Sequence, residues 1–85
     1  MLWEKTTEEK FNKLIGKMPV VMRGIAQKKV SDKAQSLAQA AHKQEIGEKE
    51  MVDAFFAETP FGFQGLMKND LQELGIDYLQ YGYSR

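Results

Sequence analysis

The stretch VVMRGIAQKKVSDKAQSLAQAAHK, residues 20–43, decides the fold of this 85-residue chain. Apolar residues recur in it at intervals of three and four, which is the spacing of one face of an α-helix. They are Met22, Ile25, Ala26, Val30, Ala34, Leu37, Ala38 and Ala41. Pro19, directly before the stretch, suits the first turn of a helix. We predict one helix from Val20 to His42 or Lys43, the longest and central element of the fold.

Gly24 lies inside this predicted helix, where glycine costs about 1 kcal/mol relative to alanine. Alanines are frequent along the same segment, so that neighbouring helices could approach it closely. We interpret Gly24 as the mark of a tight crossing between the long helix and another helix.

Three shorter helices are predicted beside the long one, with bounds of about Thr7 to Gly16 or Lys17, Glu48 to about Glu58, and about Gln64 to Leu74. Thr6 and Glu9 have the spacing of a capping box for the first of them. Gly47 is an acceptable N-cap for the second, and Pro60 ends it. Gly75 can take the left-handed conformation that ends the third.

The predicted fold class is all-α: a small bundle of three main helices around a long central helix, with a short fourth helix and a tyrosine-rich tail. We expect one domain over residues 1–85, made of a three-helix core (3–58), a connection with a short helix (59–76) and a tail (77–85). The tail is compatible with an extended segment on the helices and with a frayed end. The expected core consists of Phe11, Leu14, Ile15, Met22, Ile25, Val30, Leu37, Met51, Val52, Phe55 and Leu71.

The composition excludes several kinds of protein. No cysteine is present, so no disulfide, thiolate metal site or iron–sulfur ligand set can form. No apolar run approaches the roughly 20 residues of a membrane span, and the first residues lack the apolar stretch of a signal peptide. We therefore expect a cytoplasmic protein without a membrane partner. The net charge is zero, which argues against a protein dominated by nucleic-acid binding.

The sequence contains no set of residues with catalytic or metal-ligand spacing. The one histidine, His42, is predicted at the end of the long helix, where it would complement the helix dipole. The serines have no second histidine to serve as a base. The glycines at 62 and 65 lack the lysine and the spacing of a P-loop. We therefore expect no enzyme activity, no metal site and no cofactor.

Two groups of residues are candidate contact sites. The basic residues of the long helix form either a solvated face or a surface for an acidic partner, nucleic acid or phosphate; they are Arg23, Lys28, Lys29 and Lys33. Aromatic residues are concentrated near the C-terminus, where they either cover the edge of the core or contact a planar ligand or another chain. The candidates for this second role are His42, Phe61, Phe63 and Tyr81.

One ordered set of residues carries a family resemblance: Trp3, then Met18-Pro19 followed by Arg23, Ala26, Val30 and Ala34, then Ile46, Glu50 and Ala54. This set resembles the small helical domain of the protochlorophyllide reductase (PCP reductase) family. That domain forms the C-terminal end of one component of light-independent protochlorophyllide reductase and also occurs as short free-standing proteins. The likeness covers about Trp3 to Ala57.

The resemblance implies a three-helix core and an accessory role beside a larger protein. The parent enzyme reduces a porphyrin double bond with iron–sulfur clusters held in larger domains, so the reductase activity does not follow. Arg23 is the polar position that matches the family's Pro-x-x-x-Arg motif. Our first hypothesis is a non-catalytic accessory or interaction module that docks on a larger protein. The alternatives are a small binder of a tetrapyrrole or other planar cofactor and, least favoured, a nucleic-acid-binding helical domain.

Overall fold

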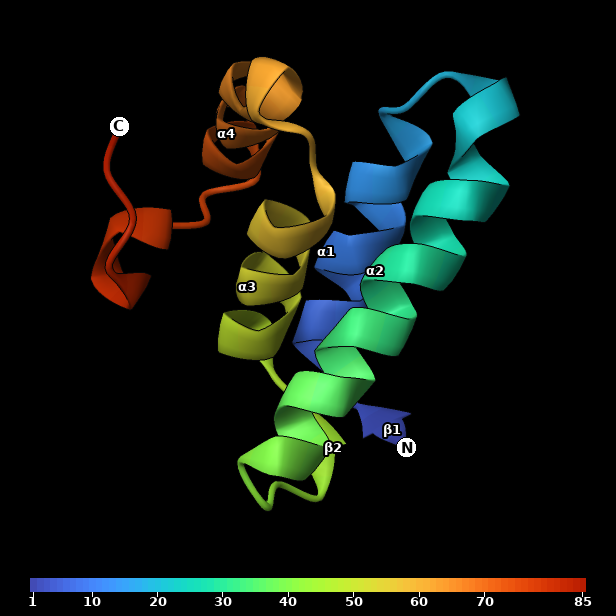
Figure 1. Ribbon diagram of the computed structural model, residues 1–85, viewed down its shortest axis with the longest axis vertical. Helices are drawn as coiled ribbons and strands as arrows, with labels where there is room; N and C mark the ends of the chain where they lie inside the picture. Colours follow the sequence, from blue (N-terminus) through green and yellow to red (C-terminus); the bar gives the residue numbers. More distant parts are fainter.

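Four α-helices joined by short connections form the body of the molecule in the computed structural model, which describes residues 1–85 (Figure 1). The elements in chain order are β1 (Leu2–Trp3), α1 (Lys5–Gly16), α2 (Val20–Ala40), β2 (Glu45–Ile46), α3 (Glu48–Glu58), the 3-10 helix η1 (Phe61–Phe63), α4 (Gln64–Glu73) and the 3-10 helix η2 (Tyr78–Tyr81). The predicted all-α class is confirmed. None of the helices combines the length and the apolar character that crossing a membrane requires.

The core lies where α1, α2 and α3 face one another. Both α1 and α3 pack against α2, the longest element, and α2 and α3 share the most extensive contact. The most buried side chains come from α3, including Met51, Val52 and Phe55, each at most 1% exposed. The ring of Phe55 meets that of Phe11 in α1 with centroids 5.9 Å apart. The expected core residues outside α2 are all buried, so this part of the prediction is confirmed.

The expected core positions in the first turns of α2 are wrong. Met22 is 55% exposed and Ile25 is 65% exposed, whereas Val30 further along the helix is buried; Leu37 is half-buried. Two features explain this exposure: α3 has 11 residues against 21 in α2, and Ile25 lies about 140° around the helix from the buried Val30, on the uncovered side. At 1.5 Å per residue, α3 covers about half of α2. Because a short connection joins the end of α2 to the start of α3, the covered half is the C-terminal one, and the first turns extend beyond α3 (Figure 1).

The tight helix crossing predicted at Gly24 is absent from the fold, and this expectation is corrected. A Cβ built at Gly24 would meet no atom within 4 Å, so no neighbouring element packs against it.

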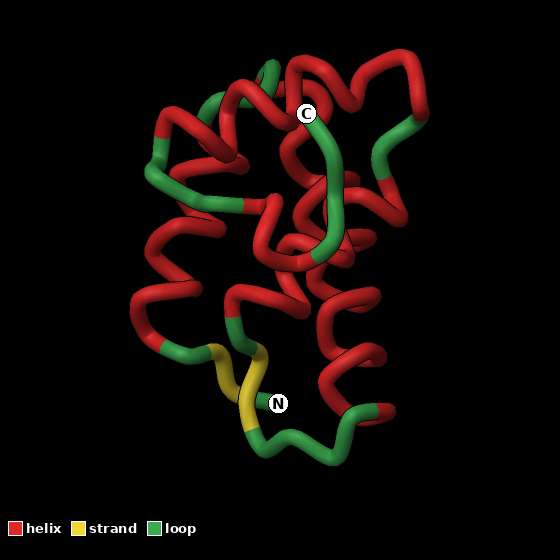
Figure 2. The backbone as a smooth tube through the Cα atoms, turned by 90° about the vertical axis from the view of Figure 1, so that its left-hand side faces the viewer, coloured by secondary structure: helices red, strands yellow, loops and turns green.

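The start of α1 also differs from the prediction, because the capping box of Thr6 and Glu9 does not form. The N-cap is Glu4, and α1 begins at Lys5. The N–H of Glu4 donates to the O of Ile46 at 2.9 Å, which continues the parallel pairing of β1 with β2 (Figure 2). This pairing holds Glu4 in an extended conformation, so the helix begins directly after it. Strands of two residues carry no periodic pattern, and the sequence therefore does not indicate them.

The predicted caps of α3 and α4 are confirmed. Gly47 is the N-cap of α3, and its N–H donates to Oε1 of Glu50 at 3.0 Å, which is the part of a capping box that glycine can form. Gly75 has a φ of 72°, and the N–H of Ile76 donates to the O of Leu71 at 3.0 Å. The side chains of Leu71 and Ile76 are both buried, as the Schellman motif requires.

The C-terminal segment packs on the helices instead of fraying. It forms η2, which contacts both α3 and α4. Tyr78 is 2% exposed, and the ring of Tyr83 lies parallel to that of Phe56 in α3 with centroids 3.7 Å apart. Of the two alternatives for the tail, the packed one is observed, with a short 3-10 helix in place of an extended segment.

Candidate functional site

The four predicted basic residues of α2 do not gather on one surface. Lys28 and Lys29 are exposed, while Arg23 and Lys33 are half-buried. With 3.6 residues per turn, Arg23 and Lys28 point in widely different directions around the helix. Nζ of Lys28 lies 3.0 Å from Oδ2 of Asp32, so part of the positive charge is neutralised on the helix itself. The structure therefore offers isolated lysines rather than a concentrated basic patch.

Arg23 makes hydrogen bonds inside the chain, and its predicted docking role stays a prediction. Its Nε donates to the O of Met18 and its Nη2 to the O of Gly16, both at 2.8 Å. These carbonyls lie at the end of α1 and in the turn that follows, where backbone acceptors lack helical partners. Pro19 is the N-cap of α2, and Arg23 lies about one turn later. The Pro-x-x-x-Arg spacing therefore places a guanidinium over the end of the preceding helix.

The candidate residues for a planar ligand lie at opposite ends of the molecule. His42 follows α2 in the turn at the lower end of Figure 1, whereas η1, with Phe61 and Phe63, lies toward the upper end beside α4. Phe61 is 89% exposed and Phe63 is 60% exposed. Tyr81 is half-buried, and its hydroxyl donates to Oε1 of Glu48 at 2.8 Å. One ligand therefore cannot contact all four residues, and His42 cannot ligate a ring bound at Phe61.

His42 instead forms part of the cap that ends α2. Its φ of 58° lies in the left-handed region. The N–H of His42 donates to the O of Gln39 at 3.0 Å, and that of Lys43 donates to the O of Ala38 at 2.9 Å. This pair of bonds is a Schellman motif, in which glycine is the usual residue at the position of His42.

The buried carboxylate of Glu50 belongs to the same region and is fully paired. It is 4% exposed, and its Oε2 accepts from Nζ of Lys43 at 2.6 Å. Burial alone would raise the pKa of Glu50, but the hydrogen bonds from Lys43 and from the N–H of Gly47 outweigh it, and the pKa is lowered overall. Glu50 is therefore ionised near neutral pH and joins the turn after α2 to the start of α3.

Two tyrosines hold the C-terminal segment on α3. Besides the bond from Tyr81 to Glu48, the hydroxyl of Tyr83 donates to Oδ1 of Asp53 at 2.5 Å. Burial and these carboxylate acceptors raise the pKa of Tyr81 above its usual range and the pKa of Tyr83 to about 12. Burial would raise the pKa of Glu48, but bonds from Lys10 and Tyr81 lower it overall. Each group keeps the charge state that this pairing needs near neutral pH.

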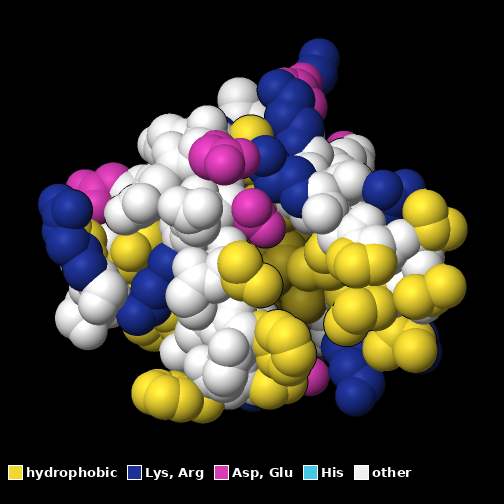
Figure 3. All heavy atoms as spheres, turned by 90° about the horizontal axis from the view of Figure 1, so that it is seen from above, with side chains coloured by type: hydrophobic (Ala, Val, Ile, Leu, Met, Phe, Trp, Pro, Cys, Tyr) yellow, Lys and Arg dark blue, Asp and Glu magenta, His cyan; other side chains and the backbone are white.

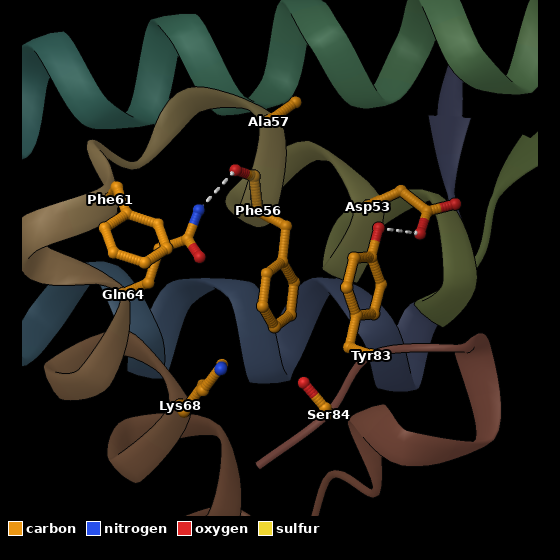
Figure 4. Close-up of a pocket in the computed structure, with 8 residues that line it drawn as sticks. All are labelled: Asp53, Phe56, Ala57, Phe61, Gln64, Lys68, Tyr83 and Ser84. Carbon is orange, nitrogen blue, oxygen red and sulfur yellow. Dashed lines mark hydrogen bonds between the residues drawn. The ribbon is translucent and has the colours of Figure 1, made fainter.

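A shallow groove of about 440 Å³ lies between α3, the η1–α4 segment and the C-terminal residues (Figure 4). It is lined by Asp53, Phe56, Ala57, Phe61, Gln64, Lys68, Tyr83 and Ser84. Figure 4 shows the Phe56 and Tyr83 rings beside each other, with Phe61 to one side. Nζ of Lys68 lies 5.9 Å from the centroid of Phe56, at the limit of a cation–π contact.

The polar groups of this groove are largely engaged within the chain. Tyr83 is bonded to Asp53, and Nε2 of Gln64 donates to the O of Phe56 at 3.3 Å. The hydroxyl of Ser84 makes no hydrogen bond to Asp53 or Lys68, which line the same groove. No group of three or more potential metal-ligating side chains occurs elsewhere in the chain. The groove thus presents an aromatic wall and the ammonium group of Lys68.

A set of exposed large apolar side chains is the most prominent surface feature, and we name it the apolar end. Its members are Val20, Val21, Met22 and Ile25 in the first turns of α2 and Phe61, Phe63 and Leu66 in η1 and α4, with exposed fractions from 55% to 89%. Figure 3, which looks onto the upper end of the molecule, shows hydrophobic side chains gathered over the centre and along one side. Beside them Lys17 is paired with Glu73 at 2.5 Å, and Arg23 is bound to carbonyls.

The area of the apolar end is large for a chain of this size. Taking roughly 150–200 Å² for the surface of one large apolar residue, the seven residues expose on the order of 700–1,000 Å². This area is divided between the first turns of α2 and the η1–α4 segment. The apolar end therefore holds most of the large apolar side chains that the fold leaves exposed.

The sequence contains one signal for this surface. From Val20 to Met22 three consecutive residues are apolar, and Ile25 follows, so the first turns of α2 are apolar around most of the helix. A helix that is apolar all round is covered on every side, either by its own chain or by another. The regular spacing alone predicts that Met22 and Ile25 lie in the core, and it makes no prediction for Val20 and Val21.

These features together define a small all-α domain whose distinguishing surface is an exposed apolar end. The chain belongs to the DUF2621 family, a family of proteins of unknown function, which it matches over residues 1–84. The match includes α4 and the C-terminal segment, so it covers every helix and strand described above. No curated protein and no solved structure shows a significant match to this sequence.

Proposed function

We propose that this chain is a non-catalytic interaction module that docks on another protein through the apolar end. The observation that carries the proposal is the exposure of seven large apolar side chains on a chain that has a packed core elsewhere. Burying them would contribute about 25 cal/mol per Å² before the costs of association. Two of the neighbouring charged groups are engaged within the chain: Lys17 is paired with Glu73, and Arg23 is bound to backbone carbonyls.

The pKa values support a non-catalytic role. A general acid or base works best with a pKa near the operating pH. Here the pKa values are shifted away from neutral pH: the pKa is lowered for Glu48 and Glu50 and raised for Lys17 and Lys49. Every such shift favours the form that is already present at neutral pH, as in structural ion pairs.

The resemblance to the PCP reductase domain is compatible with this proposal and remains a prediction. The residues that carry it take part in helix junctions here: Arg23 binds the end of α1, Glu50 caps α3, and Trp3 stacks on Phe11 with centroids 4.6 Å apart. Such residues specify how helices join, and a shared motif of this kind would imply a shared architecture. The docking partner, by the same resemblance, would be a larger protein.

The test is site-specific photo-cross-linking in the native host. A photoreactive amino acid at Val21 is expected to give a discrete protein adduct, because Val21 is 86% exposed at the proposed interface. The matched control is the same amino acid at Ser36, which is exposed on α2 far from the apolar end and should give none. Adducts that are equal at both positions, or absent at Val21, would refute docking through the apolar end.

The basic residues provide the competing interface, which the same assay can separate. Lys28→Glu together with Lys29→Glu reverses two exposed charges without touching the core. Arg23 is left unchanged, because its loss would disturb the junction of α1 with α2. If this double variant abolishes the adduct while Ile25→Asp does not, the docking surface is the basic side of α2 and not the apolar end.

A planar ligand is the second candidate, and the groove beside Phe61 is the observation that favours it. Phe61 is 89% exposed, and Lys68 could pair with a carboxylate of the ligand. Titration with protoporphyrin is expected to shift the Soret absorption, and Phe61→Ala should weaken the shift while His42→Ala leaves it unchanged. A flat titration removes this candidate.

A further inference from the structure

Residues 79–85 are attached to the helices by side chains alone, and we name them the strap. Their backbone hydrogen bonds are local, as in the bond from the N–H of Gly82 to the O of Leu79 at 3.0 Å. No backbone hydrogen bond joins the strap to α3 or α4. Just before it, Ile76 and Tyr78 are each only 2% exposed. The firmly buried part of the C-terminal segment therefore ends at Tyr78.

Two tyrosine hydroxyls make the polar contacts of the strap with α3: Tyr81 donates to Glu48, and Tyr83 donates to Asp53. Each of these carboxylates also holds a lysine ammonium on its other oxygen, at 2.8 Å for Lys10 with Glu48 and at 2.7 Å for Lys49 with Asp53. A carboxylate that loses its tyrosine therefore keeps a charged partner, and no unpaired charge is left behind. The strap can thus leave α3 without disturbing the ion pairs beneath it.

The ring of Tyr83 covers aromatic surface that the groove would otherwise offer to a ligand. It lies parallel to the ring of Phe56, with an angle of 4° between the two planes and centroids 3.7 Å apart (Figure 4). A flat ligand stacks on an aromatic ring in a similar way. Because both rings line the groove, Tyr83 and a ligand stacked on this face of Phe56 exclude each other.

We propose that the strap is autoinhibitory: Tyr83 takes the place of a planar ligand on Phe56, and the strap opens as a unit before such a ligand binds. The inference rests on the second candidate function, a planar ligand in the groove, and adds its regulation. The ligand class is an aromatic ring with an acidic group, the ring for Phe56 and the acid for Lys68, whose Nζ lies 5.9 Å from the centroid of Phe56.

The strength of the inhibition depends on how rarely the strap opens. When only the open form binds, the apparent Kd equals the Kd of the open form divided by the open fraction. Tyr81→Phe removes one hydroxyl–carboxylate bond of the strap and leaves every residue that lines the groove in place. The loss of such a bond should raise the open fraction about 5- to 50-fold and lower the apparent Kd by the same factor.

The experiment compares the wild type with Tyr81→Phe in two assays on the full chain. Chymotrypsin needs an extended chain, so the initial rate of cleavage after Tyr83, followed by mass spectrometry, measures how often the strap opens. Titration with protoporphyrin, followed by the Soret absorption, gives the apparent Kd. The matched control is Tyr78→Phe, which removes a hydroxyl that is bonded to Gln72 and precedes the strap, and it should change neither value.

The outcomes separate the strap from the ligand. Faster cleavage and a lower Kd in Tyr81→Phe, by similar factors, support the inference. Faster cleavage with an unchanged or higher Kd refutes inhibition by Tyr83 and keeps the planar ligand. Cleavage of the wild type that is no faster after Tyr83 than after the buried Phe55 refutes a separate opening of the strap. A flat titration of all three proteins refutes the planar ligand and its inhibition together, and it leaves docking through the apolar end to the cross-linking assay.

Discussion

Truncating Ile25 and Phe55 to alanine tests how the structure divides the apolar residues between core and surface. The spacing of the sequence places both residues in the core, and by that view both changes would be severe. In the structure Phe55 is 1% exposed between α1 and α2, whereas Ile25 is 65% exposed. The two substitutions should therefore differ by several kcal/mol.

The magnitudes follow from burial. Ile25→Ala removes three carbons, of which about a third of the surface is buried, so at about 0.8 kcal/mol per fully buried methylene the loss is about 0.8 kcal/mol. No cavity forms at a site open to water, and the better helix propensity of alanine offsets part of the loss. Phe55→Ala leaves a cavity in a closed core and should cost about 3–5 kcal/mol.

The assay is urea unfolding of both variants at a low protein concentration. Far-UV circular dichroism follows the helices, and the fluorescence of Trp3, which stacks on Phe11, follows the core. Coincident transitions justify two-state free energies. A loss above about 2 kcal/mol for Ile25→Ala at low concentration would refute the uncovered position of the first turns of α2.

Three other predictions concern helix ends and pH. Arg23→Ala should lower the free energy of unfolding by about 1–3 kcal/mol, because the carbonyls of Gly16 and Met18 lose a charged donor. Arg23→Lys can keep only one of the two bonds, so its free energy of unfolding should lie between those of the wild type and Arg23→Ala. An unchanged stability of Arg23→Ala would contradict the capping role. His42→Gly should raise the free energy of unfolding by about 0.5–1 kcal/mol in the same assay, because a φ of 58° strains every residue with a Cβ, and a loss would contradict this. Folding lowers the pKa of Glu50 below its ordinary value of 4.5, so the ionised carboxylate stabilises the fold above pH 4.5. This contribution is lost as the pH falls through the pKa of the folded state. Urea unfolding at decreasing pH should show a stability loss that is smaller in Glu50→Gln, and equal pH dependence in both proteins would refute it.

Much of the fold can be predicted because the deciding signals are local. The bounds of α3 follow from Gly47 and Pro60 at its two ends. The end of α4 follows from Gly75, since only a residue at ease with positive φ fits there. The start of α1 cannot be predicted in this way, because it depends on the pairing of Glu4 with Ile46, which is distant in the sequence.

The tyrosines show a similar division between composition and placement. The abundance of aromatics near the C-terminus predicts that they cover the core or contact a partner, and both kinds of position occur. Tyr78 is buried, and Tyr83 stacks on Phe56, but Phe61 points into water. Which ring takes which position depends on where the chain turns after α4, and the sequence pattern carries no information on that direction.

The exposure of the first turns of α2 follows both from the length of α3 and from the side of α2 on which each residue lies. Periodicity shows that positions 22 and 25 are apolar, but their exposure depends on where α1 and α3 lie along and around α2. Ile25 lies about 140° around α2 from the buried Val30, so a longer α3 on that side would not cover it. α3 ends at Thr59-Pro60, and the first turns of α2 extend beyond it (Figure 1). The spacing alone does not show which side of these first turns faces a neighbour, which is why the same segment suggests a core in the sequence and is exposed in the structure.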